Sequence, residues 1–245
     1  ATAIAAAAVR RGVPVAVGYN LRFSPGLAWL RERLHAGVIG PVRIARAEVG
    51  QYLPDWRPGQ DYRSGVSARR ELGGGALLEL SHELDYLTSL LGAPQSVAAM
   101  VSQTSELELD VEDCAQLLLG FTSSDGRRVS ASVTLDFVRR DPRRRCTLVG
   151  RDGTLEWDSI TGRATHFAAA SGHTDVFEQP VADRDATYRA EWLDFAEAIM
   201  TGRSPLVGAE AGSRVVALVA AARLAASEGR VVALDGTGAR EATEC

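Results

Sequence analysis

The sequence predicts an α/β (α+β) fold: a mixed, largely antiparallel open sheet that is covered by helices and preceded by one parallel αβ unit. Residues 2–12 read as a helix and are followed directly by an apolar run at 13–20, which indicates a buried strand. Apolar and polar residues then alternate at 128–138, as in a sheet with one buried face. Helical patterns at 187–201 and 208–228 supply the cover.

The first half continues with a helix, a strand and a long loop. Ser24 and Pro25 form an N-cap and first-turn signal, and Gly37 ends the helix. A strand is expected around 41–53. Residues 53–72 mix prolines, glycines, aromatic residues and charges without sustained periodicity. A loop of this length inside a compact domain is usually functional.

A further helix is expected over 76–92, with four leucines on its apolar face and Gly92 past its end. Three glycines at 73–75 precede it and allow a close approach of the backbone. The remaining elements are a hairpin around Asp152-Gly153, strands near 163–169 and 175–181, and a short strand over residues 230–234.

Composition limits the possible classes of protein. A chain of 245 residues with 46% hydrophobic content can bury a real core, and no apolar run is long enough to span a bilayer. The net charge of −4 argues against a general nucleic-acid binder. Cys114, Cys146 and Cys245 lack CxxC spacing, which favours free thiols in a reducing cytoplasm.

Basic residues have two unusual features. All 27 Lys+Arg residues are arginine, so any chemistry that needs a lysine must come from outside this chain. Residues 139–145 hold five arginines around Asp141-Pro142. This cluster is expected to be a solvated loop between two strands, and a site for a phosphate or an acidic partner is the alternative.

Glu79, His82 and Asp85 lie three residues apart, so on one helix they share a face. A carboxylate beside an imidazole orients the ring and raises its basicity, which suits a general acid or base near neutral pH. Surface residues or helix caps would give the same pattern. A metal site is weakly supported because a third ligand is not evident.

Five segments in order make the chain resemble the C-terminal part of the Gfo/Idh/MocA family of NAD(P)-dependent oxidoreductases. They are VPVAVGYNLRFSPGLAWLRERLHAGVIGPV, DWR, GGGALLELSHELD, YRAEWLDFAEAIMTGRSPLV and the final helix of small residues. The resemblance implies that 1–20 is the end of a dinucleotide-binding Rossmann domain, 21–235 a substrate-binding and dimerisation domain, and 236–245 a tail. The family's Glu-Lys-Pro motif, with its lysine, would fall before residue 1, so the chain is expected to be N-terminally truncated or to lack its redox half.

The resemblance places the catalytic histidine at His82, its carboxylate partner at Glu79 and a following acid at Asp85. The spacing ELSH is one residue shorter than the family's acid-to-histidine spacing, and Glu79 replaces an aspartate. Arg22 would lie near the nicotinamide or the substrate, and Tyr19 and Asn20 would line the same cleft.

The loop GQYLPDWRPGQDYRSGVSA, residues 50–68, also resembles that of a subgroup associated with bacterial sugar biosynthesis. Its substrate-binding candidates are Trp56, Arg57, Tyr62 and Arg63, because aromatic faces stack on sugars and arginine binds carboxylate or phosphate in a forked geometry. Each could equally anchor the loop. The expected activity is hydride transfer between NAD or NADP and a secondary alcohol or ketone of a sugar or nucleotide sugar. A homodimer or homotetramer formed through the open sheet is expected, and the alternative is a non-catalytic sugar-binding regulator or scaffold.

Overall fold

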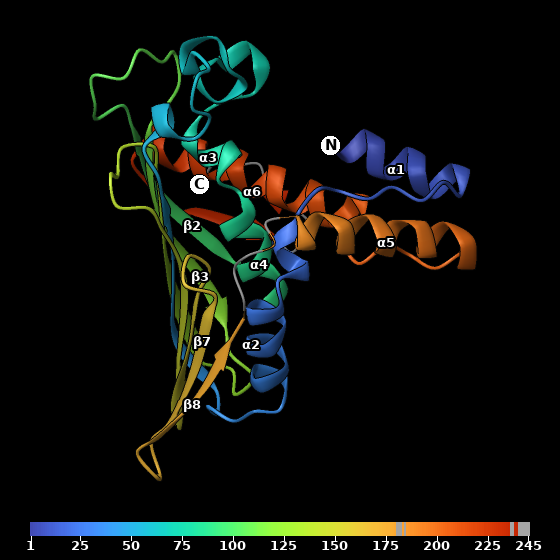
Figure 1. Cartoon of the computed structure of the whole chain (residues 1–245), viewed down its shortest axis with the longest axis vertical. Coiled ribbons are helices and arrows are strands. Elements are labelled where there is room, and N and C mark those ends of the chain that lie inside the picture. Colours follow the sequence, from blue (N-terminus) through green and yellow to red (C-terminus); the bar gives the residue numbers. More distant parts are fainter. Residues whose placement is uncertain (180–182, 184, 236–237, 240–245) are drawn as a thin grey trace, which may run out of the picture.

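The computed structural model describes residues 1–179, 183, 185–235 and 238–239. One ten-stranded sheet forms a layer, and the helices lie on one side of it (Figure 1). The expected open sheet covered by helices is therefore confirmed. The predicted tail 236–245 lies outside the described residues except for 238–239.

Most helices and strands fall close to the expected positions, with three strands that the sequence analysis missed, β2, β3 and the short β10. The helices are α1 (Thr2–Arg11), α2 (Pro25–His35), α3 (Ala76–Glu79), α4 (His82–Leu91), α5 (Ala186–Thr201) and α6 (Ala209–Glu228). The strands are β1 (Val42–Gly50), β2 (Ser96–Ser102), β3 (Cys114–Thr122), β4 (Arg128–Asp136), β5 (Arg143–Gly150), β6 (Gly153–Asp158), β7 (Arg163–Ala168), β8 (His173–Glu178), β9 (Val232–Asp235) and β10 (Gly238–Ala239). Short 3₁₀ helices are η1 (Asn20–Phe23), η2 (Leu53–Asp55), η3 (Tyr62–Ser64), η4 (Val66–Ala68) and η5 (Arg70–Leu72).

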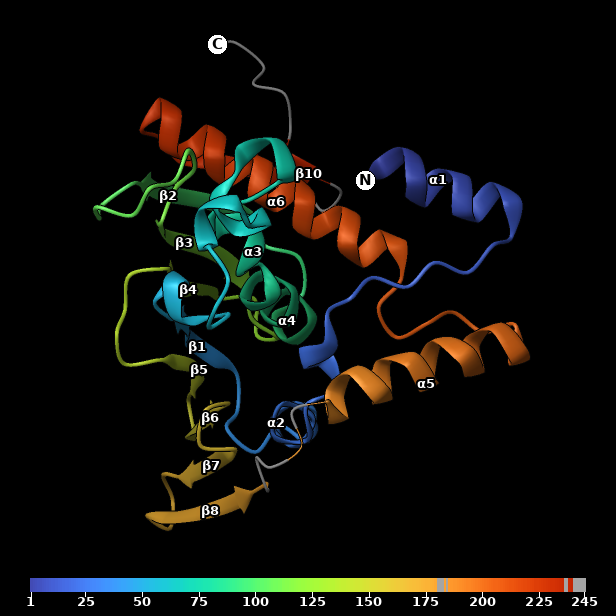
Figure 2. The ribbon, with the colours of Figure 1, turned by 45° about the horizontal axis from the view of Figure 1, so that its top comes forward.

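The strand order is β10-β9-β2-β3-β4-β1-β5-β6-β7-β8. Within the described sheet, β1 and β4 pair in parallel and the other neighbours are antiparallel. β1 lies between β4 and β5, which follow each other in the sequence (Figure 2). Val49 on β1 therefore has Leu135 of β4 on one side and Arg144 of β5 on the other.

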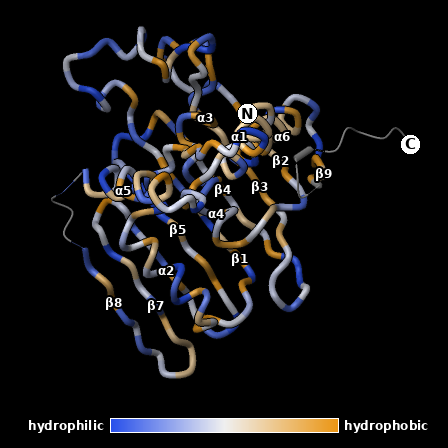
Figure 3. The backbone as a smooth tube through the Cα atoms, turned by 90° about the vertical axis from the view of Figure 1, so that its right-hand side faces the viewer, coloured by the Kyte–Doolittle hydropathy of each residue, from blue (hydrophilic) through white to orange (hydrophobic). Residues whose placement is uncertain are grey.

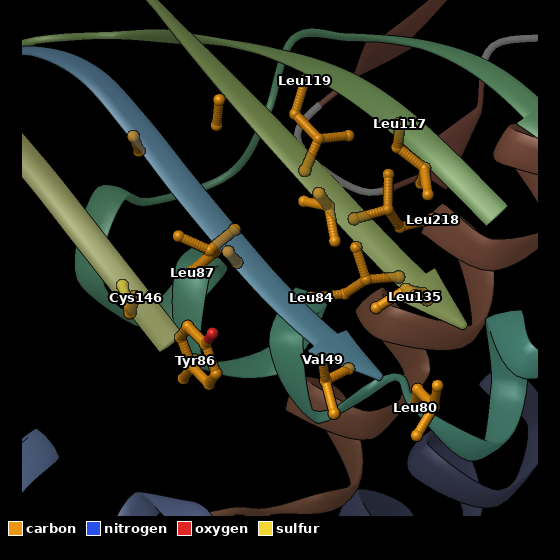
Figure 4. Packing of buried hydrophobic residues seen from close by; sticks show 14 of the residues in the cluster. Val49, Leu80, Leu84, Tyr86, Leu87, Leu117, Leu119, Leu135, Cys146 and Leu218 are labelled. Atoms are coloured by element: carbon orange, nitrogen blue, oxygen red, sulfur yellow. The ribbon is translucent and has the colours of Figure 1, made fainter. Parts of the chain in front are cut away.

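The core lies between the sheet and α4, α6 and α2. Leu84 and Leu87 of α4 are fully buried in one cluster with Leu135 of β4 and Leu218 of α6, and Leu84 lies beside Leu135 (Figure 4). Along most of β4, buried apolar residues alternate with half-exposed or exposed residues, as the sequence predicts. Burial of one leucine side chain contributes on the order of 2 kcal/mol, so this layer dominates the stability of the fold.

The opposite face of the sheet carries no helix in the part of the chain that the structure describes (Figure 1). Several apolar side chains are exposed on its strands. Met100 is 74% exposed, Leu118 61% and Phe167 43%. The helix-covered face of the same strands is buried, so the sheet is open on one side only.

The expected buried strand at 13–20 is wrong. The segment is extended but forms only an isolated bridge between Ala16 and Gly208 and a hydrogen bond from the Val17 amide to the Val207 carbonyl. None of residues 13–19 is buried. A parallel strand needs neighbouring strands on both sides, and the described chain places none there.

Candidate active site

Two glycines shape the junction between the 53–72 loop and α3, the helix that precedes His82. A Cβ atom on Gly74 would run into the backbone carbonyl oxygens of Val66, Ser67 and Arg69, so only glycine fits between η4 and α3. Gly75 has a φ of +105°, which lies outside the range that side chains favour. The glycines therefore press the end of the 53–72 loop against the start of α3, as the sequence analysis expected.

The single helix expected over 76–92 is wrong. α3 ends at Glu79, Leu80 has φ −101° and ψ 22°, and a second helix begins at His82. The shortened ELSH spacing coincides with this break. Because the two residues belong to different helices, Glu79 and His82 do not share one stripe.

Glu79 does not pair with His82 in this geometry. Its Oε2 atom accepts a 2.6 Å hydrogen bond from the hydroxyl of Ser67, which belongs to η4. The expectation that a carboxylate raises the basicity of His82 is therefore wrong. Glu79 instead ties the 53–72 loop to the end of α3.

His82 is mostly buried at the first position of α4. Its Nδ1 atom is buried without a hydrogen-bond partner among the described residues. The ring of Tyr19 meets the imidazole edge to face, with centroids 5.3 Å apart. Burial, and then the positive charge of Arg144, lower the pKa of His82 to about 4. His82 is consequently neutral at physiological pH, and it is a weaker base and, once protonated, a stronger acid than a free imidazole.

Arg22 and Asp85 form a buried ion pair. Arg22 Nε and Nη2 donate to the two carboxylate oxygens of Asp85 at 2.7 and 2.8 Å, and Nη1 donates to Ser89 at 2.7 Å. The Asp85 side chain is 2% exposed. This forked pair joins η1 to α4 and holds the segment that carries Tyr19 against His82.

Tyr19 and Asn20 both lie at the junction of η1 with other elements. The Tyr19 hydroxyl shares a 3.2 Å hydrogen bond with the hydroxyl of Ser81, the residue before His82. Asn20 is buried, and its Nδ2 donates to Thr187 at the start of α5 at 2.7 Å. The structure thus brings Tyr19 against His82, brings Arg22 to Asp85 on the same helix, and directs the Asn20 amide elsewhere.

A buried ion pair that the sequence analysis missed lies next to His82. Glu83 is fully buried, and its Oε1 accepts a 2.9 Å hydrogen bond from Nε of Arg144. Burial raises the pKa of Glu83 to about 6, against the opposing effect of Arg144. The spacing of the motif drew attention to residues 79, 82 and 85, whereas Glu83 would have required its partner on β5 to be known.

The loop candidates divide into anchors and exposed side chains. Trp56 donates from Nε1 to the Gln51 carbonyl and packs edge to face on Phe137, 5.3 Å away. The Tyr62 hydroxyl accepts a hydrogen bond from the Glu108 amide.

Arg63 forms ion pairs with Asp61 and Glu108, whereas Arg57 is exposed. None of the hydrogen bonds, ion pairs or ring contacts of the described residues joins these candidates to His82.

The arginine cluster at 139–145 spans a short loop and the start of β5. Four of its arginines face carboxylates and Arg140 stacks on the Tyr52 ring, 3.3 Å from its centre. The carboxylate pairs are Arg139 with Glu48, Asp136 and Asp141, Arg143 with Asp141, Arg144 with Glu83, and Arg145 with Asp158. The cluster is therefore largely neutralised and does not present an open phosphate site.

Two further features concern the described residues alone. No three His, Cys, Asp or Glu side chains among them converge as metal ligands. None of their helices combines the length and low polarity of a membrane span.

The fold and site together define an α/β domain in which a mostly buried, neutral histidine starts a helix above an open sheet. Residues 31–234 match the model of the oxidoreductase family, C-terminal alpha/beta domain. The chain belongs to this family, Gfo/Idh/MocA, and the resemblance in the sequence is confirmed.

Similar proteins support this assignment. An uncharacterized oxidoreductase of Synechocystis sp. is 28% identical over 209 residues, which are 81% of this chain and 54% of the relative. The solved structure of an aldose-aldose oxidoreductase from Caulobacter crescentus, complexed with glycerol, is 25% identical with a TM-score of 0.77. The match covers 94% of this chain and 66% of that one.

A UDP-N-acetylglucosamine 3-dehydrogenase from Acidithiobacillus ferrooxidans shares the fold at 24% identity and a TM-score of 0.70. That match covers 93% of this chain and 66% of the dehydrogenase chain. The chain thus spans about half the length of the curated relative and just under two thirds of these two solved chains.

Proposed function

We propose that this chain is the substrate-binding part of an NAD(P)-dependent oxidoreductase that interconverts a secondary alcohol and a ketone on a sugar or nucleotide sugar. The observation that carries the proposal is His82, a neutral and mostly buried imidazole with an unpartnered Nδ1 atom at a helix start. Family membership and sugar-converting neighbours support the substrate class.

In the proposed reaction His82 accepts the hydroxyl proton of the substrate. A neutral imidazole can do this at pH 7, and a lowered pKa favours the return of that proton in the reverse direction. Tyr19 limits the movement of the ring from one side. The ion pair of Arg22 with Asp85 fixes the backbone on which both aromatic groups sit.

NAD or NADP is the proposed cofactor, because similar structures include complexes with NAD+ or NADH. A bound nicotinamide would supply the hydride acceptor. Asn20 and Arg22 stay proposed near it; the Asn20 amide donates to Thr187, and the Arg22 guanidinium donates to Asp85 and Ser89.

The exposed apolar surface of α1 and α5 supports the proposal that a second domain packs on these helices and binds the dinucleotide. Trp192 and Leu193 on α5 are 69% and 71% exposed, and Val9 on α1 is 83% exposed. Both helices extend away from the sheet (Figure 1), and a groove of about 1090 Å³ runs between them and the start of α6. A nucleotide-binding domain packed here would bury these side chains.

The open face of the sheet is the proposed interface of a homodimer or homotetramer. Met100 and Leu118 project from it with more than half of their surface exposed. Exposed apolar residues that gather on one face mark an interaction surface more often than isolated ones do.

Turnover by the full-length protein tests the proposed function. NAD+ and NADP+ would be offered with a panel of aldoses and UDP-sugars, and formation of the reduced cofactor would be followed by absorbance. Replacing His82 with asparagine (His82→Asn) should lower kcat by at least about 100-fold, the usual contribution of a positioned general base. His35→Asn changes an exposed histidine on α2 and should leave the rate unchanged.

Glu79→Gln separates two roles for the carboxylate. If Glu79 is the catalytic partner of His82, Glu79→Gln should reduce kcat as strongly as His82→Asn does. The bond from Ser67 to Glu79 predicts a smaller effect on kcat and a larger effect on substrate binding. Sugar binding without turnover in the parent protein would overturn the enzyme proposal and support a sugar-binding regulator.

A further inference from the structure

The most informative group outside the proposed chemistry is the ion pair between Glu83 and Arg144. We propose that Arg144 is a positioning residue for His82, which fixes the first turn of α4 through Glu83 and brings a positive charge to the helix start that carries the imidazole. This inference rests on the proposed function of His82. It also gives one member of the 139–145 cluster a specific role.

The geometry connects Arg144 to the site through one residue. Glu83 directly follows His82 and has no exposed surface. Arg144 reaches it from β5, with Nε 2.9 Å from Oε1 and Nη2 3.5 Å from Oε2. The Arg144 side chain is 22% exposed, so its charge is only partly screened by water.

Two ion pairs fix α4 from different directions. Glu83 points to β5 in the sheet, whereas Asp85 points to Arg22 in η1. Both carboxylates lie in the first turn of the helix, where the helix dipole favours negative charge. Well-packed apolar side chains would stabilise a helix at least as well as a buried ion pair does. The pairs are therefore better explained by the position and charge that they impose on His82.

The charges around His82 come from four elements. They are Glu83 and Asp85 on α4, Arg22 in η1 beside Tyr19, Glu79 on α3, and Arg144 on β5. The carboxylates on α4 are each matched by one arginine, and Glu79 is bonded to Ser67. Burial has the largest effect on the pKa of His82, and the charge of Arg144 has the next largest. Both lower the pKa.

A titration of the imidazole tests the inference without any need for activity. The Cε1 resonances of the four histidines would be followed by NMR from pH 8 to pH 4 in the parent and in Arg144→Gln, with His82→Gln to assign the signal. We expect the pKa of His82 to rise by about one unit or more in Arg144→Gln, because the nearby positive charge is removed. Arg144→Lys, which retains the charge, should titrate close to the parent.

A second variant covers the risk that Arg144→Gln fails to fold, because it leaves Glu83 buried and unpaired. Glu83→Gln/Arg144→Gln removes both charges and should still titrate above the parent, by less than the single variant. An unchanged pKa of His82 in these variants would overturn the inference.

In the full-length enzyme, the acidic limb of kcat/KM should move to higher pH by the same amount as the imidazole titration. If the pKa of His82 rises in Arg144→Gln but the parent protein shows no turnover, the proposed function is overturned and the charge effect of Arg144 on His82 is established.

Discussion

The helices α4 and α5 differ in how many of their residues are buried. Half of the ten residues of α4 are buried, including Glu83, Leu84 and Asp85. Only Ala198 is buried among the sixteen residues of α5, where Trp192 remains largely exposed. Figure 1 shows α5 extending away from the sheet while α4 lies close to the strands, and the hydropathy colours of Figure 3 show hydrophobic residues on both strands and helices.

The difference shows that an apolar helix pattern reports the existence of a partner but not its location. α4 has its apolar and ionic partners on β1, β4, β5 and α6 of the described chain. The large apolar side chains of α5 have no such cover there. Changes on α4 should therefore alter the stability of this chain, and equivalent changes on α5 should not.

The largest expected effect comes from Arg22→Met, which leaves Asp85 buried without its cation. Breaking a buried ion pair typically costs about 3–5 kcal/mol, and urea unfolding would measure the loss. Arg203→Met is the matched control just past the end of α5, where Arg203 pairs with Asp194 and Glu197 of that helix but is 37% exposed. That loss should be below about 1 kcal/mol, and equal losses would contradict the comparison.

A slightly smaller effect is expected for Leu84→Ala. Leu84 is fully buried, so the lost contacts and the remaining cavity should reduce the free energy of unfolding by about 2–5 kcal/mol. Leu193→Ala removes the same atoms from an exposed position on α5 and should change stability by less than about 0.5 kcal/mol. A large loss for Leu193→Ala in this chain would show that α5 is already covered.

The smallest expected effect is the contribution of His82 to pH-dependent stability. Its pKa falls from 6.5 in the unfolded chain to about 4 in the fold, so folding favours the neutral ring. This contribution is present above pH 6.5 and is lost as the pH falls toward 4. The loss is about 3 kcal/mol at most. Glu83, with a raised pKa, acts in the opposite sense.

The difference between the parent and His82→Gln isolates the histidine from the other titrating groups. Urea unfolding between pH 7 and pH 4.5 should show a steeper loss of stability in the parent. Parallel curves for the two proteins would mean that the ring is not held in its neutral form.

Local patterns predicted most of the fold. Alternation identified β4, and Asp152-Gly153 identified the β5–β6 hairpin. β2 and β3 were missed because residues such as Leu117, Leu118 and Leu119 form a continuous apolar run without a clear period. The parallel pairing of β1 with β4 could not be predicted, because it joins segments far apart in the sequence.

The site was predicted less completely than the fold. His82 was identified by its motif and by family resemblance, and the structure places Tyr19 against it. Helical spacing misassigned Glu79, because the helix breaks at Leu80. Arg144 looked like part of a solvated cluster, since its contact with Glu83 depends on the register of β5 against β1.

The position of β1 has a consequence for the order of folding. β4 and β5 are joined by a short loop, yet they cannot pair with each other, because β1 separates them. The hairpins β3–β4, β5–β6, β6–β7 and β7–β8 need only local loop closure, whereas β1 must close the long stretch 51–127 before it meets β4. Long-range pairing of this kind is slow. We therefore expect the insertion of β1 to be a late step in folding, which joins the two halves of the sheet and brings Arg144 into register with the helix that carries His82.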